Sequence, residues 1–234
     1  MRASRIKGRD KNAHALRSWD LTGMTTHRLG RGPNIIGIGG TVRAGSSTER
    51  ALVCSLRRAD ALGAQVRIFG GEFLAKLPPF DPRPAQPTRE QVELVEGLRS
   101  ADGIILASPG YHGSVSGVVK NALDTLELTA KDELPYFHGR PVGMIVTAFG
   151  WQATGSTLQA MRTIVHAMRG WPTPFGAALN TTVGLFDDAG VCREPKDAWA
   201  LDTVAEQVME FAGMRKGLQA NPASLCAGAA RATM

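Results

Sequence analysis

A short run of residues rich in glycine and hydroxyl side chains, with one arginine, joins an apolar segment to the expected start of a helix. Gly39 and Gly40 permit a sharp bend directly after the apolar residues 35–38. Just beyond them the first N–H groups of the helix lack intrahelical partners, and the helix dipole favours negative charge there. Four hydroxyls and one guanidinium complete the predicted phosphate site: Thr41, Arg43, Ser46, Ser47 and Thr48.

The same run has a simpler interpretation, in which Gly-Gly-Thr is only a turn and Ser46 or Ser47 only caps the helix. The glycines are too closely set for the Gly-x-Gly-x-x-Gly pattern of dinucleotide sites, and no Gly-Lys-Ser/Thr follows as in a P-loop. A hydroxyl-rich loop with an arginine suits the terminal phosphate of a mononucleotide.

A second run, Ser-Pro-Gly-Tyr-His-Gly-Ser-Val-Ser-Gly-Val-Val-Lys-Asn-Ala-Leu-Asp, occupies residues 108–124. With the first loop it resembles the NAD(P)H-dependent FMN reductase family, a branch of the flavodoxin-like flavoproteins. That family carries Gly-Ser-x-Arg-x-x-Ser after its first strand and Pro-x-Tyr-x-x-Ser-x-x-Gly-x-x-Lys-Asn-x-Leu-Asp after its third. Here Thr41 replaces the first serine, and the second motif matches from Pro109 to Asp124. The resemblance spans about residues 33–213.

The residue types of the second run agree with a flavin contact. Proline and glycine predict an extended, open loop whose backbone N–H groups face outward, where they can pair with the pyrimidine edge of a flavin and stabilise its reduced anionic ring. The predicted contacts are Pro109, Gly110, Tyr111, His112, Gly113 and Ser114.

No protein acid or base is expected to be catalytic, because hydride passes directly from nicotinamide to flavin N5. His112 either hydrogen-bonds at the rim of the flavin or is an exposed loop histidine without a proton-transfer role, and the second interpretation is favoured. Lys120 and Asp124, one helical turn apart, are expected to be surface or interface charges. Asn121 is expected to hold the neighbouring loop.

A third segment follows the fourth expected strand. The resemblance implies that Thr147, Phe149 and Gly150 line the flavin. Many relatives have two adjacent glycines here, whereas this chain has Phe149-Gly150-Trp151, so the close backbone contact with the flavin is in question. Trp151 is either part of that lining or a core or interface aromatic.

Strand-like and helical patterns alternate along the chain. Short apolar strands separated by helices indicate a parallel sheet covered on both faces. The fold expected is α/β: a doubly wound, five-stranded, flavodoxin-like parallel sheet with strand order 2-1-3-4-5 and FMN at the switch point. Strands are expected at 35–40, 65–69, 103–107, 142–148 and about 175–181, and helices at 47–62, from 88, at 116–126, near 156–168 and at about 196–213.

The formal charge of +6 arises entirely in residues 1–31, and the rest of the chain is neutral. We expect a basic, disordered leader at 1–32, a reductase domain at 33–213 and a loose Ala/Gly-rich tail at 214–234. A neutral domain argues against nucleic-acid binding, and no apolar stretch indicates a signal or a membrane span. Three widely spaced cysteines predict neither disulfides nor a metal site, which favours the cytoplasm.

Three function classes fit these features. The favoured one is an enzyme with bound FMN that takes hydride from NADH or NADPH and reduces a second acceptor. That acceptor would be free FMN for a monooxygenase partner, a quinone, an azo dye or a metal ion. The alternatives are an electron carrier, disfavoured because flavodoxins are markedly acidic, and an FMN-binding redox sensor. Because one flavin face would otherwise be open to water, and because the Pro-rich segment 70–88 is apolar, we expect a homodimer or homotetramer with shared active sites.

Overall fold

The computed structural model describes residues 32–83 and 86–220, and its core is a parallel sheet. The strand order is β2-β1-β3-β4-β5, with β6 also paired to β4. Val142 pairs with Pro172 of β5 and Ile145 with Ala177 of β6, so these two short strands share one side of β4 as an interrupted fifth strand. The predicted order 2-1-3-4-5 is therefore confirmed. The strands are β1 Asn34–Gly39, β2 Gln65–Phe69, β3 Gly103–Pro109, β4 Pro141–Ala148, β5 Trp171–Pro172 and β6 Ala177–Asn180.

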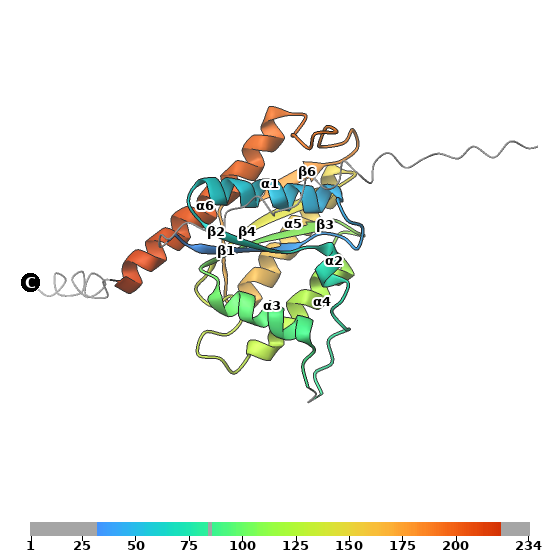
Figure 1. Ribbon diagram of the computed structural model, residues 1–234. Helices are drawn as coiled ribbons and strands as arrows, with labels where there is room; N and C mark the ends of the chain where they lie inside the picture. Colours follow the sequence, from blue (N-terminus) through green and yellow to red (C-terminus); the bar gives the residue numbers. More distant parts are fainter. Residues whose placement is uncertain (1–31, 84–85, 221–234) are drawn as a thin grey trace, which may run out of the picture.

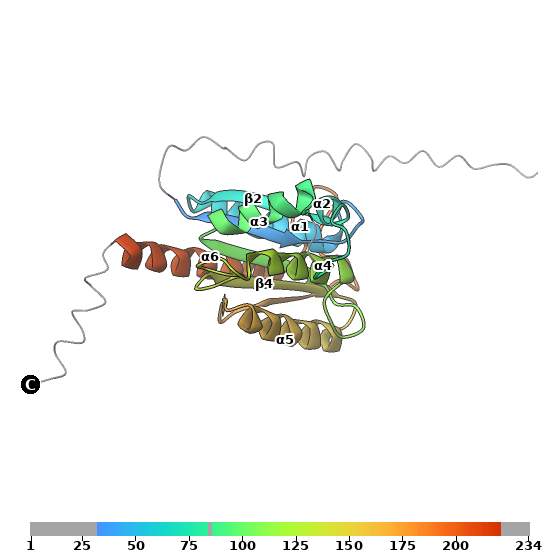
Figure 2. The same cartoon turned by 90° about the horizontal axis from the view of Figure 1, so that it is seen from below.

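Helices cover both faces of the sheet (Figures 1 and 2). On one face lie α1 (Ser47–Ala61) and α6 (Pro195–Ala220), which pack on each other. The other face carries α3 (Arg89–Ser100), α4 (Gly117–Thr125) with its 3-10 extension η4 (Leu126–Thr129), and α5 (Trp151–Ala167). Each face has its own apolar cluster, as expected for a doubly wound sheet.

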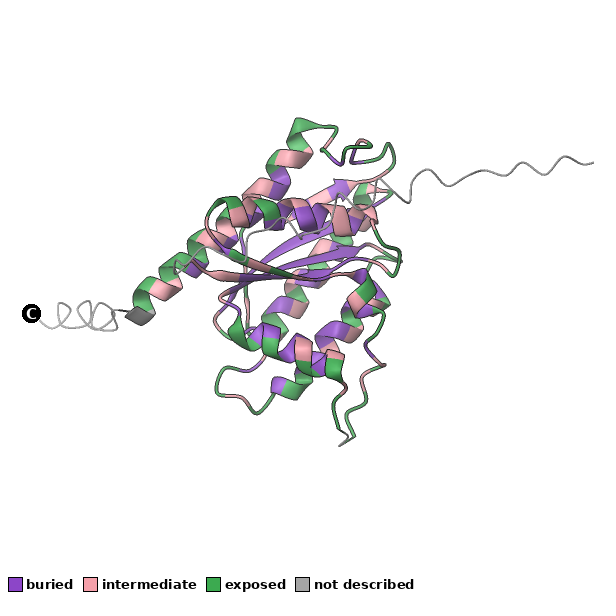
Figure 3. Cartoon of the chain, viewed as in Figure 1, coloured by how far each residue is buried: buried purple, intermediate pink, exposed green. Residues whose placement is uncertain are grey.

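Burial follows the sequence pattern. Every residue of β3 and β4 is buried, as is usual for central parallel strands between two helical layers (Figure 3). On the inner face of α1, Leu52, Leu56 and Ala59 are fully buried. Thr88 caps α3 through a reciprocal capping box with Gln91, which explains why that helix begins where it does.

Three expected boundaries were wrong. The Pro-rich segment contains a short helix, α2 (Gly71–Leu74), because Leu74 can bury its side chain against the core. Helix α5 begins at Trp151 rather than near residue 156, and Gly150 is its N-cap.

The third correction concerns the last helix, which continues to Ala220 past the expected end at 213. Lys216 holds this final part against the domain, since its Nζ lies 2.7 Å from Asp102 Oδ2 and 3.2 Å from the carbonyl oxygen of Gly32. The predicted leader up to residue 31 and the tail beyond residue 220 lie outside the described residues.

Arg140 is a buried guanidinium that ties β4 to the α3–β3 junction. It donates to the carbonyl oxygens of Ala101 at 2.8 Å, Tyr136 at 3.1 Å and Arg99 at 3.4 Å, and burial lowers its pKa. Arg140→Met would leave these carbonyls buried without a donor. We expect a loss of about 2–4 kcal/mol in the free energy of unfolding, measured by urea titration.

The control for Arg140→Met is Arg67→Met on β2, which removes an exposed ion pair with Glu93 of α3. An exposed pair contributes at most about 1 kcal/mol. Equal losses in the two variants would show that the buried hydrogen bonds of Arg140 do not stabilise the fold.

Candidate functional site

The three segments singled out in the sequence meet at one edge of the sheet, at the carboxyl ends of β1, β3 and β4. Backbone hydrogen bonds hold them together. Gly40 donates to the carbonyl of Ala107 at 3.3 Å, and Gly110 donates to that of Thr147 at 2.8 Å. Ligands of open α/β sheets bind at this edge, where the strand order reverses.

The first loop runs from the end of β1 to the start of α1. Its glycines adopt backbone angles that other residues disfavour, with φ of 120° at Gly40 and 66° at Gly45. The hydroxyl of Thr41 accepts from the N–H of Arg43 at 3.2 Å, and the Arg43 side chain lies on an exposed stretch. Ser46 is the N-cap of α1 and Ser47 its first residue. The capping interpretation of Ser46 is confirmed, and it leaves the other N–H groups of the first turn directed toward the loop.

Glu49 places a carboxylate inside this loop. Its Oε2 accepts from the N–H of Gly45 at 2.7 Å and its Oε1 from the N–H of Gly71 at 3.2 Å, which links the loop to α2. The loop and α2 are also in tight backbone contact, because a Cβ on Gly71 would lie 1.6 Å from the carbonyl oxygen of Thr41. The Gly45 amide is therefore already paired with a carboxylate oxygen, and Glu49 fixes the shape of the loop.

Thr48 and Thr147 differ from the other predicted hydroxyl contacts because both are buried. Their hydroxyls lie 2.6 Å apart and share a hydrogen bond across α1 and β4. This hydrogen bond joins α1, which follows the first loop, to β4, which leads into the third segment, so it sets the spacing between the two.

The second loop is tighter than expected. Tyr111 and Ser114 exchange backbone hydrogen bonds, both 3.0 Å, around a two-residue turn. His112 and Gly113 occupy the turn with φ of 51° and 82°, the positive values that such turns require. The prediction of an extended loop was wrong, and three of its N–H groups, those of Gly110, Tyr111 and Ser114, are already paired. The side chains of Tyr111 and His112 are exposed at the edge.

Supporting residues below this loop behave as predicted. Asn121 accepts from the N–H of Phe80 at 2.8 Å and donates to the carbonyl of Pro78 at 2.9 Å, so it does fix the adjacent Pro-rich segment. Lys120 and Asp124 form an exposed ion pair of 2.7 Å along α4.

The third segment presents two aromatic rings to solvent. Phe149 is 80% exposed and Trp151 is 61% exposed, so Trp151 is not a core residue of this chain. The carbonyl of Phe149 accepts from the hydroxyl of Thr182 at 2.7 Å, which fixes the segment to the loop after β6. Exposed aromatic rings beside an open edge can stack on planar ligands.

Three supporting residues were missed in the sequence. Glu49 carried a signal, because Ser46-x-x-Glu49 is a capping-box pattern. Ser108, whose buried hydroxyl accepts from the N–H of Ser116 at 2.9 Å and so holds the second loop, carried none. Thr182 acts through a contact between distant segments and carried none either.

Within the part of the chain that the structure describes, no helix is both long enough and apolar enough to cross a bilayer. The sheet order and the three loops at its edge define a flavodoxin-like α/β protein.

The chain belongs to the NADPH-dependent FMN reductase family, whose sequence model matches residues 33–182. The resemblance inferred from the two loop motifs is thereby confirmed. An FMN-dependent NADPH-azoreductase of Staphylococcus aureus is 39% identical over 82 residues, which are 35% of this chain and 40% of that protein. The match thus spans less than half of that relative.

Solved structures share the fold. FerB, a flavoenzyme NAD(P)H:(acceptor) oxidoreductase from Paracoccus denitrificans, superposes with a TM-score of 0.64 at 17% identity, covering 78% of this chain and 98% of that one. The apo form of an NADH:FMN oxidoreductase, EMOB, gives 0.60 at 21% identity and covers 76% and 88%. At these identities the likeness shows the fold alone.

Proposed function

We propose that the protein is an FMN-dependent NAD(P)H oxidoreductase that reduces a second, small-molecule acceptor. The observation that carries the proposal is the meeting of three loops of suitable chemistry at the carboxyl edge of β1, β3 and β4. Membership of the NADPH-dependent FMN reductase family supports it. Bound FMN would supply the two-electron chemistry, accepting hydride at N5 and passing the electrons on.

The residues present fit FMN. The first loop would hold the phosphate with the Arg43 guanidinium, the hydroxyls of Thr41 and Ser47 and the first-turn amides of α1. The Gly45 amide would not take part, because it already donates to the Glu49 carboxylate. The turn at 111–114 and the segment 149–150 would lie along the ring system, with the Thr48–Thr147 pair setting the distance between the loops.

The finer proposal concerns the acceptor. Free FMN, passed on to a flavin-dependent monooxygenase, or a quinone is a flat molecule that can stack between the flavin and an exposed aromatic ring. Tyr111, Phe149 and Trp151 supply such rings around the edge. The azoreductase activity named for the Staphylococcus aureus relative is of the same kind, because azo dyes are also planar.

Turnover separates this proposal from a redox sensor or an electron carrier. The purified protein is loaded with FMN, and oxidation of NADH and of NADPH is followed in parallel with FMN, a quinone, an azo dye and ferric iron as acceptors. We expect continuous nicotinamide oxidation with at least one acceptor. Bound FMN with no turnover on any of them would contradict the enzyme and favour a sensor or carrier.

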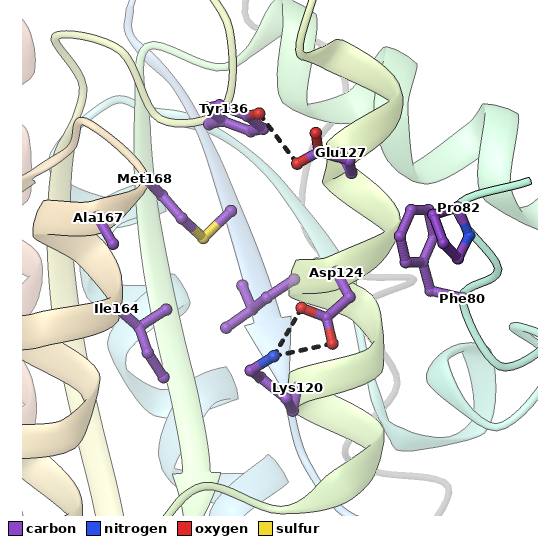
Figure 4. Close-up of a pocket in the computed structure, with 10 residues that line it drawn as sticks. Phe80, Pro82, Lys120, Asp124, Glu127, Tyr136, Ile164, Ala167 and Met168 are labelled. Carbon is purple, nitrogen blue, oxygen red and sulfur yellow. Dashed lines mark hydrogen bonds and ion pairs between the residues drawn. The ribbon is translucent and has the colours of Figure 1, made fainter.

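We further propose that the protein assembles as a homodimer or a dimer of dimers. A cavity of about 530 Å³ lies between the Pro-rich segment and the outer sides of α4 and α5 (Figure 4). It combines apolar side chains, among them Phe80, Ile164 and Met168, with the Lys120–Asp124 pair. Because Ile164, Ala167 and Met168 lie at the end of α5 remote from Trp151, a copy docked here would have to extend along α4 to reach the flavin edge.

Light scattering at micromolar protein concentration is expected to give the mass of a dimer or tetramer, because two-fold association is the commonest solution for soluble proteins. Phe80→Asp should shift this mass toward the monomer by placing a charge in the cavity. Val92→Asp, on an exposed position of α3, serves as the control. A wild-type monomer with full turnover would contradict a shared active site.

A further inference from the structure

Cys54 and Cys192 lie far apart in the sequence but their thiols are in contact. Cys54 belongs to α1, and Cys192 to the segment between β6 and α6. The thiol of Cys192 donates a hydrogen bond to the sulfur of Cys54. Both residues are half-buried and both pack on the apolar cluster beneath α1 and α6. The pair is therefore sheltered by the fold but remains within reach of a small molecule from solvent.

Backbone pairing holds Cys192 in place. The segment folds back on itself as a small hairpin, in which Phe186 and Cys192 form an antiparallel bridge and Arg193 donates to the carbonyl of Leu185 at 2.9 Å. Leu185 and Phe186 are buried in the same cluster as Leu52 and Leu56 of α1. The hairpin is thus anchored against the helix that carries Cys54.

The position of Cys54 is fixed from the other side. The neighbouring Ser55 donates its hydroxyl to the carbonyl of Leu201 on α6 at 2.8 Å and is completely buried. The backbones that carry the two sulfurs are therefore fixed, and the thiols move only by rotation about their Cα–Cβ bonds. Two thiols held in contact by rigid elements have already lost the chain entropy that disulfide formation normally costs.

The surroundings make the two sulfurs chemically unequal. The hydrogen bond from Cys192 lowers the pKa of Cys54, and the positive charges of Arg57 and Arg50 lower it further, against the opposing effects of burial and of the Asp202 charge. The pKa of Cys192 is raised, first by its hydrogen bond to Cys54 and then by burial. Because the thiolate is the nucleophile, Cys54 is the sulfur that reacts first, and Cys192 is the one that resolves.

We propose that Cys54 and Cys192 form a peroxide-reactive dithiol, a second redox site on the opposite side of the sheet from α4 and α5. The Cys54 thiolate attacks one oxygen of hydrogen peroxide, the O–O bond breaks, and a sulfenic acid and hydroxide form. The Cys192 sulfur then attacks the sulfenic sulfur, the S–S bond forms and water leaves. Two thiols are oxidised to one disulfide, and the peroxide is reduced to two waters with the two thiol protons.

The dithiol is connected to the flavin edge. The Cys192 segment begins directly after β6, where the Thr182 hydroxyl lies 2.7 Å from the carbonyl oxygen of Phe149 and 2.6 Å from Asn180 Oδ1, with one proton to share between them. A disulfide would tether this segment to α1, the helix that starts at the phosphate loop. A reduced flavin that reacts with oxygen yields hydrogen peroxide, so the proposed function would supply the oxidant at this site. Only this source of peroxide rests on the proposed function, because the thiol chemistry does not need the flavin.

The test uses the full chain with hydrogen peroxide as the only probe, so it does not depend on reductase activity. Cys226 lies outside the described residues, and Cys226→Ser removes it as an alternative partner. The reduced variant is exposed to peroxide, the excess is destroyed with catalase, and remaining thiols are alkylated in denaturant. We expect each chain to run singly in denaturant, without cross-links to another chain. It should have lost the mass of two hydrogens and both alkylation sites, and it should yield a Cys54–Cys192 cross-linked peptide.

Single replacements then assign the roles. In the Cys226→Ser background, Cys192→Ser should leave a sulfenic acid on Cys54 that dimedone traps. Cys54→Ser should slow peroxide consumption by at least about tenfold, because the more acidic thiol is gone. Failure to form the Cys54–Cys192 peptide, cross-links between chains instead of within one, or dimedone labelling of Cys192 would each overturn the proposal.

Discussion

Arg43→Ala is expected to weaken FMN binding by about 1.5–3 kcal/mol, the typical contribution of a hydrogen bond to a charged group. This corresponds to a dissociation constant roughly 10- to 150-fold higher. Arg43 lies on an exposed part of the first loop, where its guanidinium can reach a phosphate beside the amides of α1. Quenching of flavin fluorescence on titration with FMN measures the change.

Riboflavin, which lacks the phosphate, provides the internal control for this measurement. Wild-type protein should bind FMN more tightly than riboflavin or FAD, and Arg43→Ala should leave riboflavin binding unchanged. Arg67→Ala, on the exposed side of β2, is the matched control variant. Equal affinities of the wild type for FMN and riboflavin would refute the phosphate site, and so would a parallel loss of both ligands in Arg43→Ala.

Gly39→Ala is expected to lower the free energy of unfolding by about 3–5 kcal/mol, as the sum of overpacking and backbone strain. A Cβ at this position would lie 2.1 Å from the carbonyl oxygen of Ala107, and the φ of Gly39 is 155°. The clash is with the backbone of β3, the direct neighbour of β1 in the sheet. Relief would require the two strands to separate just where the phosphate loop begins.

The control for Gly39→Ala is Gly37→Ala in the same strand. Its added Cβ would meet only the ends of the Leu52 and Leu56 side chains, which can rotate. We expect a clearly smaller loss, about 1–2 kcal/mol, in urea denaturation. Similar losses for the two glycines would show that the contact between Gly39 and Ala107 is not what requires glycine.

Much of the candidate site could be predicted because its determinants are local. A glycine bend after an apolar strand, followed by a capping serine, predicts both the turn and the helix start from adjacent residues. The helix start at Thr88 and the Lys120–Asp124 pair are likewise short-range features, and both were placed correctly. The boundary of α5 was missed because Gly150 caps it through its backbone, without the polar side chain that signals a helix start.

The role of each loop residue was less predictable. Thr48 and Ser47 are neighbours with similar hydroxyls, yet only Thr48 is buried against Thr147 of another strand. The turn at 111–114 is tighter than expected because His112 adopts a positive φ next to Gly113, which residue type alone does not predict for histidine. Neither outcome is encoded in residue type alone.

The sequence by itself determined the alternation of strands and helices, the order of the sheet and the edge at which the loops gather. The alternation follows from hydrophobic period and the shared edge from the rule that parallel strands end at the same side, whereas the order came with the flavodoxin-like class that this pattern fits. Only the tertiary structure decided that Glu49 bridges Gly45 and Gly71, and that Cys54 meets Cys192. Such contacts join segments that the chain itself separates, so they depend on how the helices pack on the sheet and not on any local pattern.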